Sequence, residues 1–394
     1  MENVFVLISP NADREDVRNY LNKNELSQLK ICTEPNLPSF INPLEPIVIL
    51  LLSGGTEILV KKIVEKAFST IYINCVPLNN ALSAGAELKG YYHNNQGIKI
   101  TTYTEEAFKL LFNVEKYKER LNKSKILMIG KPHDWVLTSE FIAPLAPFKT
   151  KIFPVTVKEL IRTYELVDPQ KANEAAEYWL DKKDTEFLPR SEFYNTAVNY
   201  LAIKILLEKY DANMLTLRCG ELQPKSSSIC LTMERLNEEG IISACEGDLE
   251  AVFSLKILNM LTKKLCWMTN ISHIDFIDNL LYLTHCTVPL DLFNINSTYL
   301  FKNAPDYDFI EEFLDVRLPQ DITIFRIGKD SRVDILEGTV NSEILGKYNF
   351  CRSAMQIQAN TSLFDWYDNI CGNHQVVVYG KYADQLRHFF QIIY

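Results

Sequence analysis

Residues 214–260 read MLTLRCGELQPKSSSICLTMERLNEEGIISACEGDLEAVFSLKILNM, and this stretch decides the fold class. Its two short apolar runs, residues 214–217 and 241–245, each precede a longer segment whose apolar residues recur every three or four positions. That spacing places the apolar side chains on one face of a helix. The order strand, helix, strand, helix favours parallel strands joined by right-handed crossovers.

The same alternation occupies the first third of the chain. The run at residues 47–52 is apolar throughout, which is typical of a parallel strand covered on both faces. It ends at the turn 53–57 (SGGTE), before a segment of helical spacing. A polar stretch at residues 116–125 separates this region from a second alternating region. We therefore expect an α/β protein with two Rossmann-like parallel-sheet domains, at residues 1–123 and 124–263.

From about residue 265 the apolar period changes to two. Residues 322–327 and 332–336 flank the turn GKDS at 328–331, which is the pattern of a β-hairpin. Met355, Ile357 and Ala359 alternate with glutamines, as in a half-buried strand. These patterns predict a mainly antiparallel, β-barrel-like C-terminal domain at residues 264–394, with a last helix at 383–393.

Composition and charge exclude several classes of function. The 394 residues carry a net charge of -9 and no long basic stretch, so nucleic acid and anionic membranes are poor partners. The longest apolar run, residues 47–52, is far shorter than the roughly 20 residues of a membrane-spanning helix. The first residues lack the basic segment of a signal peptide, so we expect a cytoplasmic protein.

Common catalytic motifs are also missing from the sequence. It contains no Walker loop, no dinucleotide-binding glycine fingerprint and no Gly-x-Ser-x-Gly turn. The nine cysteines are scattered without any Cys-x-x-Cys pair, which favours reduced thiols over a zinc cluster or a disulfide framework. The chemistry must therefore come from residues that are distant in sequence.

The first candidate is the segment 245–248 (CEGD), which follows a predicted strand and precedes a helix. Ligands of open α/β sheets bind at the carboxyl ends of strands. Asp248 suits the N-cap of that helix, because aspartate side chains accept hydrogen bonds from the first free backbone N–H groups. Glu246 is then the functional candidate, and it needs partners from elsewhere in the chain.

A set of short motifs supplies such partners by resemblance. They are residues 53–57 (SGGTE), 130–135 (GKPHDW), 218–219 (RC), 236–240 (LNEEG), 245–248 (CEGD), 267–270 (WMTN), 283–286 (LTHC) and 372–374 (GNH). In this order they resemble the L-fucose isomerase and L-arabinose isomerase superfamily, in its short, divergent branch. The resemblance spans most of the chain, and the family's two Rossmann-like domains and C-terminal β-barrel agree with the organisation described above.

The resemblance implies a manganese site made of Glu246, Asn270 and His374, with Glu246 and Asn270 at the catalytic positions. In the family, the metal and two carboxylates move a proton between C1 and C2 of an aldose through an ene-diol. The family has an aspartate at the position of Asn270. An amide carries no charge and takes up no proton near neutral pH, so we expect weak or absent manganese binding here.

The resemblance also implies substrate contacts and an assembly. Trp135, Asp248, His285 and Glu57 are further substrate-binding candidates, and the ligand is expected to be a monosaccharide. Family members form trimers or hexamers with sites between subunits, so we expect a homo-oligomer in which Glu57 reaches the site of a neighbouring subunit.

Three hypotheses for the function follow. The first is a metal-assisted aldose–ketose isomerase of carbohydrate metabolism, favoured by Glu246 and His374. The second is a sugar-binding or regulatory protein that has kept the fold and lost the metal site, favoured by Asn270. The third is a different carbohydrate enzyme, such as an epimerase, on the same scaffold.

Overall fold

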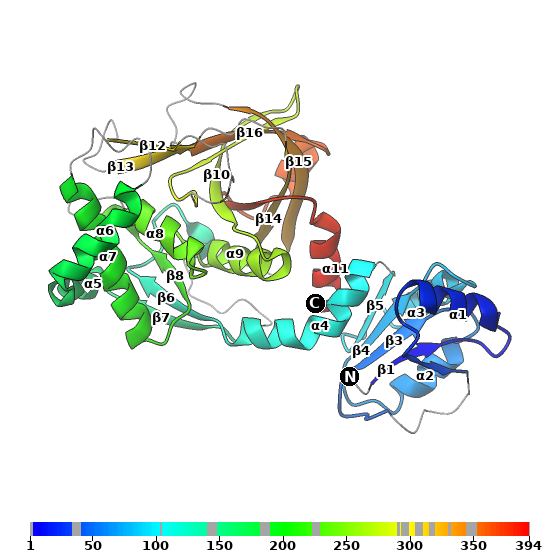
Figure 1. Ribbon diagram of the computed structural model, residues 1–394. Coiled ribbons are helices and arrows are strands. Elements are labelled where there is room, and N and C mark those ends of the chain that lie inside the picture. The colour runs from blue at the N-terminus through cyan, green and yellow to red at the C-terminus, as the bar shows by residue number, and fades with distance from the viewer. Residues whose placement is uncertain are drawn as a thin grey trace. The chain divides into compact units, whose positions relative to one another are not determined.

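The computed structural model describes residues 3–33, 41–102, 105–139, 148–181, 190–222, 229–289, 292, 299–303, 310–314, 320–329, 332–343 and 353–393. The chain divides into two compact units. The first contains residues 1–118 and 384–394, and the second contains residues 119–383. Figure 1 shows a parallel sheet in the blue part of the chain and a barrel in its yellow to orange part.

The first unit is built on a five-stranded parallel sheet of strand order β2-β1-β3-β4-β5. The strands are β1 (Val4–Leu7), β2 (Lys30–Cys32), β3 (Ile47–Leu51), β4 (Ile71–Cys75) and β5 (Ile98–Thr102). The helices are α1 (Arg14–Lys23), α2 (Glu57–Val64), α3 (Ala81–Tyr91), α4 (Glu105–Asn122), which continues into the second unit, and α11 (Ala383–Ile393). Because β1 lies between β2 and β3, the winding of the sheet reverses beside β1.

Burial explains why the central strands lack alternation. All five residues of β3 and all five of β4 are buried. One face of the sheet packs against apolar residues of α2 and α3. On the other face, the hydroxyl of Tyr72 in β4 donates a hydrogen bond to Glu115 of α4, at 3.1 Å. A strand covered by helices on both faces needs apolar residues at nearly every position.

The second unit begins with a four-stranded parallel sheet of strand order β7-β6-β8-β9. Its strands are β6 (Lys125–Ile129), β7 (Lys151–Val155), β8 (Met214–Leu217) and β9 (Ile242–Ala244). Its helices are α5 (Val157–Thr163), α6 (Pro169–Leu180), α7 (Arg190–Lys209), α8 (Ile229–Glu238) and α9 (Leu249–Thr262). The strands β8 and β9 and the helices α8 and α9 are the block predicted from residues 214–260.

A closed antiparallel barrel follows, with strand order β10-β11-β16-β15-β14-β17. Its strands are β10 (Trp267–Asp275), β11 (Leu280–His285), β14 (Gln320–Ile327), β15 (Val333–Glu343), β16 (Ser353–Ala359) and β17 (Gln375–Tyr379). The hairpin of β12 (Tyr299–Asn303) and β13 (Ile310–Leu314) forms a separate two-stranded sheet, and α10 (Leu363–Asp368) precedes β17. The barrel core contains alternating apolar residues such as Leu281 and Leu283 of β11, or Ile322 and Ile324 of β14.

The predicted fold class is confirmed. The structure has two parallel sheets with helices, followed by an antiparallel barrel. Helix α9 contacts β14 and β17, so it joins the second sheet to the barrel. The second sheet and the barrel belong to one compact unit, while residues 384–394 belong with the first unit. The division into three domains at residues 123 and 263 stays a prediction, although these boundaries fall just after α4 and α9.

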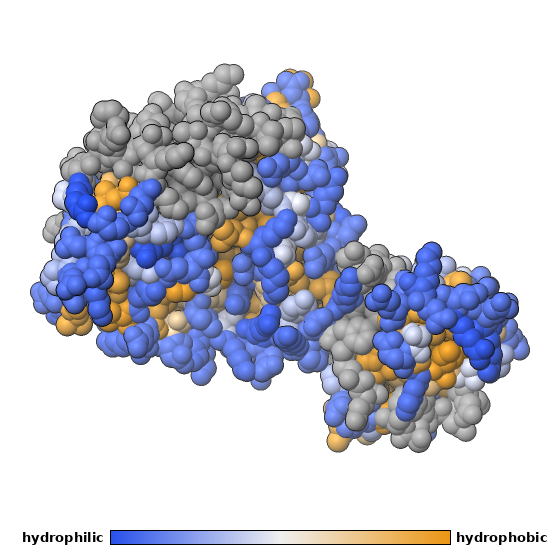
Figure 2. Space-filling view, viewed as in Figure 1, coloured by the Kyte–Doolittle hydropathy of each residue, from blue (hydrophilic) through white to orange (hydrophobic). Residues whose placement is uncertain are grey.

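One face of the molecule is mostly polar over its described residues. Figure 2 shows a largely hydrophilic face with smaller apolar patches between the polar residues, in keeping with the net charge of -9. Among the described helices, none has the length and apolar character needed to span a membrane.

Candidate metal centre

The loop after β9 presents Glu246 in an unusual backbone conformation. Glu246 has φ 64° and the following Gly247 has φ 76°, so two consecutive residues are left-handed. Glycine adopts this region freely, but a glutamate there is strained. A side chain on residue 247 would also lie 2.5 Å from the Cα of Pro132. The backbone oxygen of Glu246 accepts a hydrogen bond of 2.9 Å from the N–H of His133, which helps to hold the loop. Strain of this kind is concentrated at functional sites.

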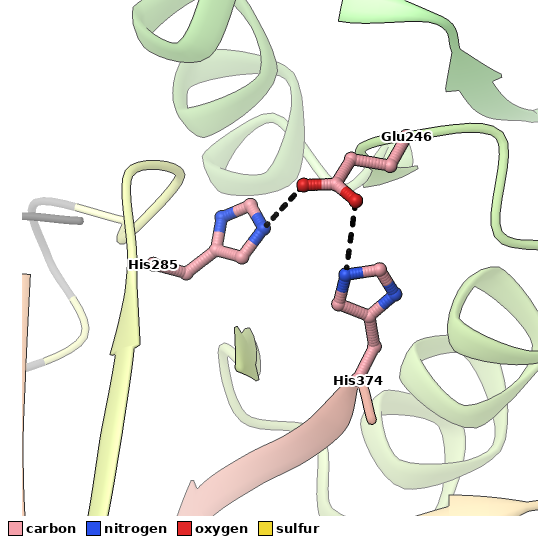
Figure 3. Close-up of side chains that lie close together, drawn as sticks. All are labelled: Glu246, His285 and His374. Carbon is pink, nitrogen blue, oxygen red and sulfur yellow. Dashed lines mark ion pairs between the residues drawn. The ribbon is translucent and has the colours of Figure 1, made fainter. Parts of the chain in front are cut away.

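Three side chains from three segments converge at this loop. Figure 3 shows His285, from the end of β11, and His374, just before β17, pointing at the carboxylate of Glu246. His374 Nε2 lies 3.3 Å from Glu246 Oε2, and His285 Nε2 lies 4.0 Å from Glu246 Oε1. One ligand atom of each residue lies within 4.8 Å of the other two.

This arrangement suits a divalent metal ion. Ligand atoms that are each about 2.1 Å from an ion lie roughly 3–4 Å apart, close to the distances found here. Apart from these contacts with Glu246, the Nε2 atoms of both histidines are buried without a hydrogen-bond partner. A buried polar atom without a partner is costly, and a bound ion would satisfy both nitrogens. The cluster of Glu246, His285 and His374 could therefore hold a divalent cation.

Asp248 contacts the ring nitrogen of His374 that faces away from Glu246. Its Oδ2 lies 2.7 Å from Nδ1 of His374, while its Oδ1 accepts a hydrogen bond of 2.8 Å from the backbone N–H of Ala251. Asp248 is thus the N-cap of α9, as predicted, and it also orients His374. A carboxylate on the far nitrogen of a ligating histidine fixes the ring and makes Nε2 the metal-binding atom.

Arg326 of β14 balances the buried negative charge. Its guanidinium lies 3.1 Å from Asp248 Oδ2 and donates a hydrogen bond of 2.7 Å to the backbone oxygen of His374. Its side chain is fully buried. Glu250 lies 3.9 Å from the same guanidinium, and Ser139 donates a hydrogen bond to that carboxylate. A buried arginine is stable only with such partners.

The two histidines have opposite pKa shifts. Burial alone would lower the pKa of His374, but Asp248 and Glu246 outweigh it and raise this pKa to about 9. Burial lowers the pKa of His285 to about 4, although Glu246 partly opposes this effect. At neutral pH without a metal ion, His374 is therefore charged and His285 is neutral.

The two carboxylates remain ionised despite their burial. Burial raises the pKa of Glu246, but the hydrogen bond and charge of His374 outweigh it, so the pKa falls to about 2. The pKa of Asp248 also lies below its usual value, because the charges of Arg326 and His374 outweigh the effect of burial. Ionised carboxylates are the state that binds a cation.

Trp135 stands at the exposed side of the cluster. Its indole Nε1 donates a hydrogen bond of 2.5 Å to Glu246 Oε2, and its ring is stacked on His133 with centroids 4.2 Å apart. The residue is 66% exposed, whereas His133 is buried. The exposed ring of Trp135 thus lies beside the half-buried carboxylate of Glu246.

Asn270 lies on β10 next to the segment of His374. The strand register pairs Thr269 with Gln375, so its continuation places Asn270 opposite His374. The Oδ1 of Asn270 accepts a hydrogen bond of 2.8 Å from Asn373 Nδ2. The oxygen predicted to bind the metal thus already has a partner, and the role of Asn270 as a ligand stays a prediction.

The other candidates fall into two groups. Trp135, Asp248 and His285 lie in contact with the cluster, His285 as a third ligand candidate where sequence analysis had expected a substrate contact. Glu57 belongs to the first unit, where it begins α2 and lines a polar pocket. Its predicted role in a neighbouring subunit stays a prediction.

Arg326 was not among the site residues predicted from the sequence. The signal was an arginine inside the apolar strand segment 322–327, which is rare without a buried acid nearby. No pattern in the sequence links Ser139 with Glu250, since these residues are 111 positions apart.

Comparison with protein-family models found no matching family, and comparison with curated proteins found no match.

Proposed function

We propose that the protein is a divalent-metal-dependent aldose–ketose isomerase that acts on a monosaccharide, with manganese as the expected ion. The observation that carries the proposal is the convergence of Glu246, His285 and His374 on one buried point. Two of these residues were expected to meet because of the resemblance to fucose and arabinose isomerases. The order of two parallel sheets and a barrel gives further support.

Each residue has a defined task in this proposal. Glu246, His285 and His374 would hold the ion, which when bound polarises the sugar oxygens and stabilises the charge that develops on them. The carboxylate of Glu246 would take the proton from C2 of the aldose and return it to C1 of the ene-diol, while the hydroxyl proton of O2 passes to O1, giving the ketose. Asp248 keeps His374 in position, and Trp135 both orients Glu246 and offers its ring to the sugar.

The test combines metal analysis with a screen for ketose formation. Protein purified without chelator is analysed for bound metal, then incubated with pentoses, hexoses and 6-deoxyhexoses with added manganese. We expect one sugar class to yield a ketose, and Glu246→Gln to lower the rate by about 10²–10⁴-fold, the usual contribution of a general base. Glu119→Gln, at an exposed ion pair with Lys123, is the matched control and should leave the rate unchanged. Absence of turnover with every sugar would contradict the proposal.

A second candidate function is favoured by Asn270. Its Oδ1 is engaged by Asn373, and its amide cannot carry a proton. A protein with this site would bind a monosaccharide without converting it. Saturable binding of a sugar by calorimetry, together with no ketose formation, would favour this regulatory or binding role over the isomerase.

A further inference from the structure

Two cysteines from different layers of the second unit lie in direct contact beside the metal centre. Cys230 is in the first turn of α8, and Cys286 follows the barrel strand β11. Their Sγ atoms are 3.2 Å apart, although 55 residues separate them in the sequence. Cys230 is buried and Cys286 is half-buried, so one member of the pair can be approached from solvent.

One cysteine of the pair is the chain neighbour of a candidate metal ligand. Cys286 directly follows His285, and its Sγ lies 3.7 Å from His285 Nδ1. Thr287 Oγ1 lies 3.1 Å from the same nitrogen. The orientation of the His285 ring therefore depends on the short segment 285–287, and a covalent bond at Cys286 would act on that segment.

A second pair of cysteines near the cluster offers an alternative disulfide. Cys219, after β8, has its Sγ 3.6 Å from His133 Nε2, and the neighbouring thiol of Cys245 lowers the pKa of Cys219. Cys245 directly precedes Glu246. Four thiols thus gather near the cluster. The contact between Cys230 and Cys286 joins α8 to the barrel, whereas Cys219 and Cys245 both follow strands of the same sheet.

We propose that Cys230 and Cys286 are a redox modification site, at which a peroxide reversibly forms a disulfide that joins α8 to the barrel beside His285. The sulfur of Cys286 attacks the O–O bond of hydrogen peroxide, which gives a sulfenic acid and one water. The sulfur of Cys230 then displaces hydroxide from that sulfur, and the thiol proton completes a second water. Two thiols lose two electrons and two protons, and a dithiol reductant reverses the change.

The geometry requires a small movement. A disulfide has sulfurs about 2 Å apart, so the two Sγ atoms must approach by roughly an ångström from their present contact. Because Cys286 is joined to His285, we expect this approach to shift the imidazole relative to Glu246. Metal–ligand distances stay within about 0.2 Å of their usual values, so a site whose histidine has moved should bind metal less well in the oxidised protein.

The first experiment identifies the bond. The full-length reduced protein is treated with hydrogen peroxide, its thiols are counted under denaturing conditions, and non-reduced peptides are mapped by mass spectrometry. We expect a loss of two thiols, a cross-link between the peptides of Cys230 and Cys286, and recovery of both thiols with dithiothreitol. A cross-link between Cys219 and Cys245 alone, or no loss of thiols, would overturn the proposal.

Variants provide the controls. Cys230→Ser and Cys286→Ser should each abolish the cross-link. Cys286 is the half-buried position, so Cys286→Ser keeps the test available if the variant at the buried Cys230 folds poorly. Cys32→Ser, in the first unit, is the matched control and should keep the reversible loss of two thiols. An equal loss in Cys230→Ser, Cys286→Ser and the control would contradict the assignment.

The second experiment measures the effect on the metal centre. We expect oxidation to shift the NMR signal of the His285 ring, assigned with His285→Gln, and to weaken manganese binding at least tenfold in calorimetry. An unchanged ring signal would overturn the coupling to His285. If the reduced protein binds no manganese, the proposed metal function fails, while the cross-link still decides the redox proposal.

Discussion

The carboxyl edges of the two parallel sheets carry different kinds of residues. In the first unit, the residues that follow β1, β3 and β4 form an open pocket of about 730 Å³ whose lining includes Ser9, Ser53, Gly54, Asn79 and Asn80. In the second unit, the loop after β9 meets the barrel, and there Glu246 and Asp248 contact two histidines and an arginine. The open edge thus carries mainly neutral polar groups, with the carboxylates of Asp13 and Glu57 at its rim, whereas the edge covered by a second layer carries charges that are paired with one another.

Burial explains the difference. Neutral amides and hydroxyls at an open edge can be hydrogen-bonded by water, so they need no protein partner. Asp248 is almost fully buried and would be unstable as an anion without Arg326 and His374. The barrel supplies both partners, so the charges of Asp248, Glu250 and Arg326 are paired where the barrel and the second sheet meet.

The largest expected effect is on stability. Arg326→Met leaves Asp248 and Glu250 buried without their cation, and should lower the free energy of unfolding by about 3–5 kcal/mol. All four tryptophans belong to the second unit, so fluorescence during urea unfolding measures this effect. Lys118→Met removes a half-exposed partner of Glu115 in the first unit. It should lower the free energy of unfolding by about 1 kcal/mol or less, as measured by circular dichroism. Equal losses would remove the contrast between the two sheets.

The next effect concerns a ligand from the barrel. His285→Ala removes one of three ligand atoms and should weaken manganese binding more than the roughly 10–100-fold caused by loss of an outer partner. His273→Ala, at an exposed position on β10, should leave the affinity unchanged. Calorimetry on both variants decides whether His285 is a ligand, and similar affinities would exclude it.

Asp248→Asn separates the two tasks of Asp248. Asparagine is as good an N-cap as aspartate, so α9 should keep its first turn. The negative charge beside His374 Nδ1 is lost, and manganese affinity should fall by roughly 10–100-fold. Asp168→Asn, which changes the exposed N-cap of α6, is the matched control with no expected effect on metal binding. Unchanged affinity in Asp248→Asn would show that the charge of Asp248 does not act on the metal through His374.

Manganese affinity should also depend on pH. The metal must displace the proton of His374, whose pKa is raised to about 9, so binding releases a proton below that pH. Affinity should therefore rise by roughly tenfold per pH unit between about pH 6 and pH 9 and then level off. His285, with its pKa near 4, adds no slope in this range. Calorimetry in buffers of different ionisation enthalpy gives the proton count directly, and a flat profile contradicts the role of His374.

The smallest effect is expected from Asn270→Asp. A carboxylate on β10 would add one negative charge near His374, and manganese binding should tighten by less than about tenfold, since Asn373 already contacts this position. Asn360→Asp, at an exposed site after β16, controls for the change in net charge. The same affinity in Asn270→Asp and in Asn360→Asp would place Asn270 outside the metal centre.

Part of the site could be predicted from the sequence because it depends on residues that are close together in the chain. Glu246 and Asp248 follow a strand and precede a helix, so their position at the sheet edge depends on nearby residues alone. His285 and Arg326 gave weaker signals, because each lies on a barrel strand whose partner residues are distant in the chain. A histidine after an apolar strand is equally compatible with a packed core residue.

The sequence by itself determined the fold class of this protein. Apolar spacing of three to four residues or of two depends on the geometry of a single helix or strand, and it marks both parallel sheets and the barrel. It also determined the cap of α9. Only the tertiary structure decided which side chains share the metal centre, since closure of the barrel sets where His285, Arg326 and His374 meet the loop of Glu246. Contacts between residues tens to more than a hundred positions apart depend on strand register and on packing across layers, which no local pattern encodes.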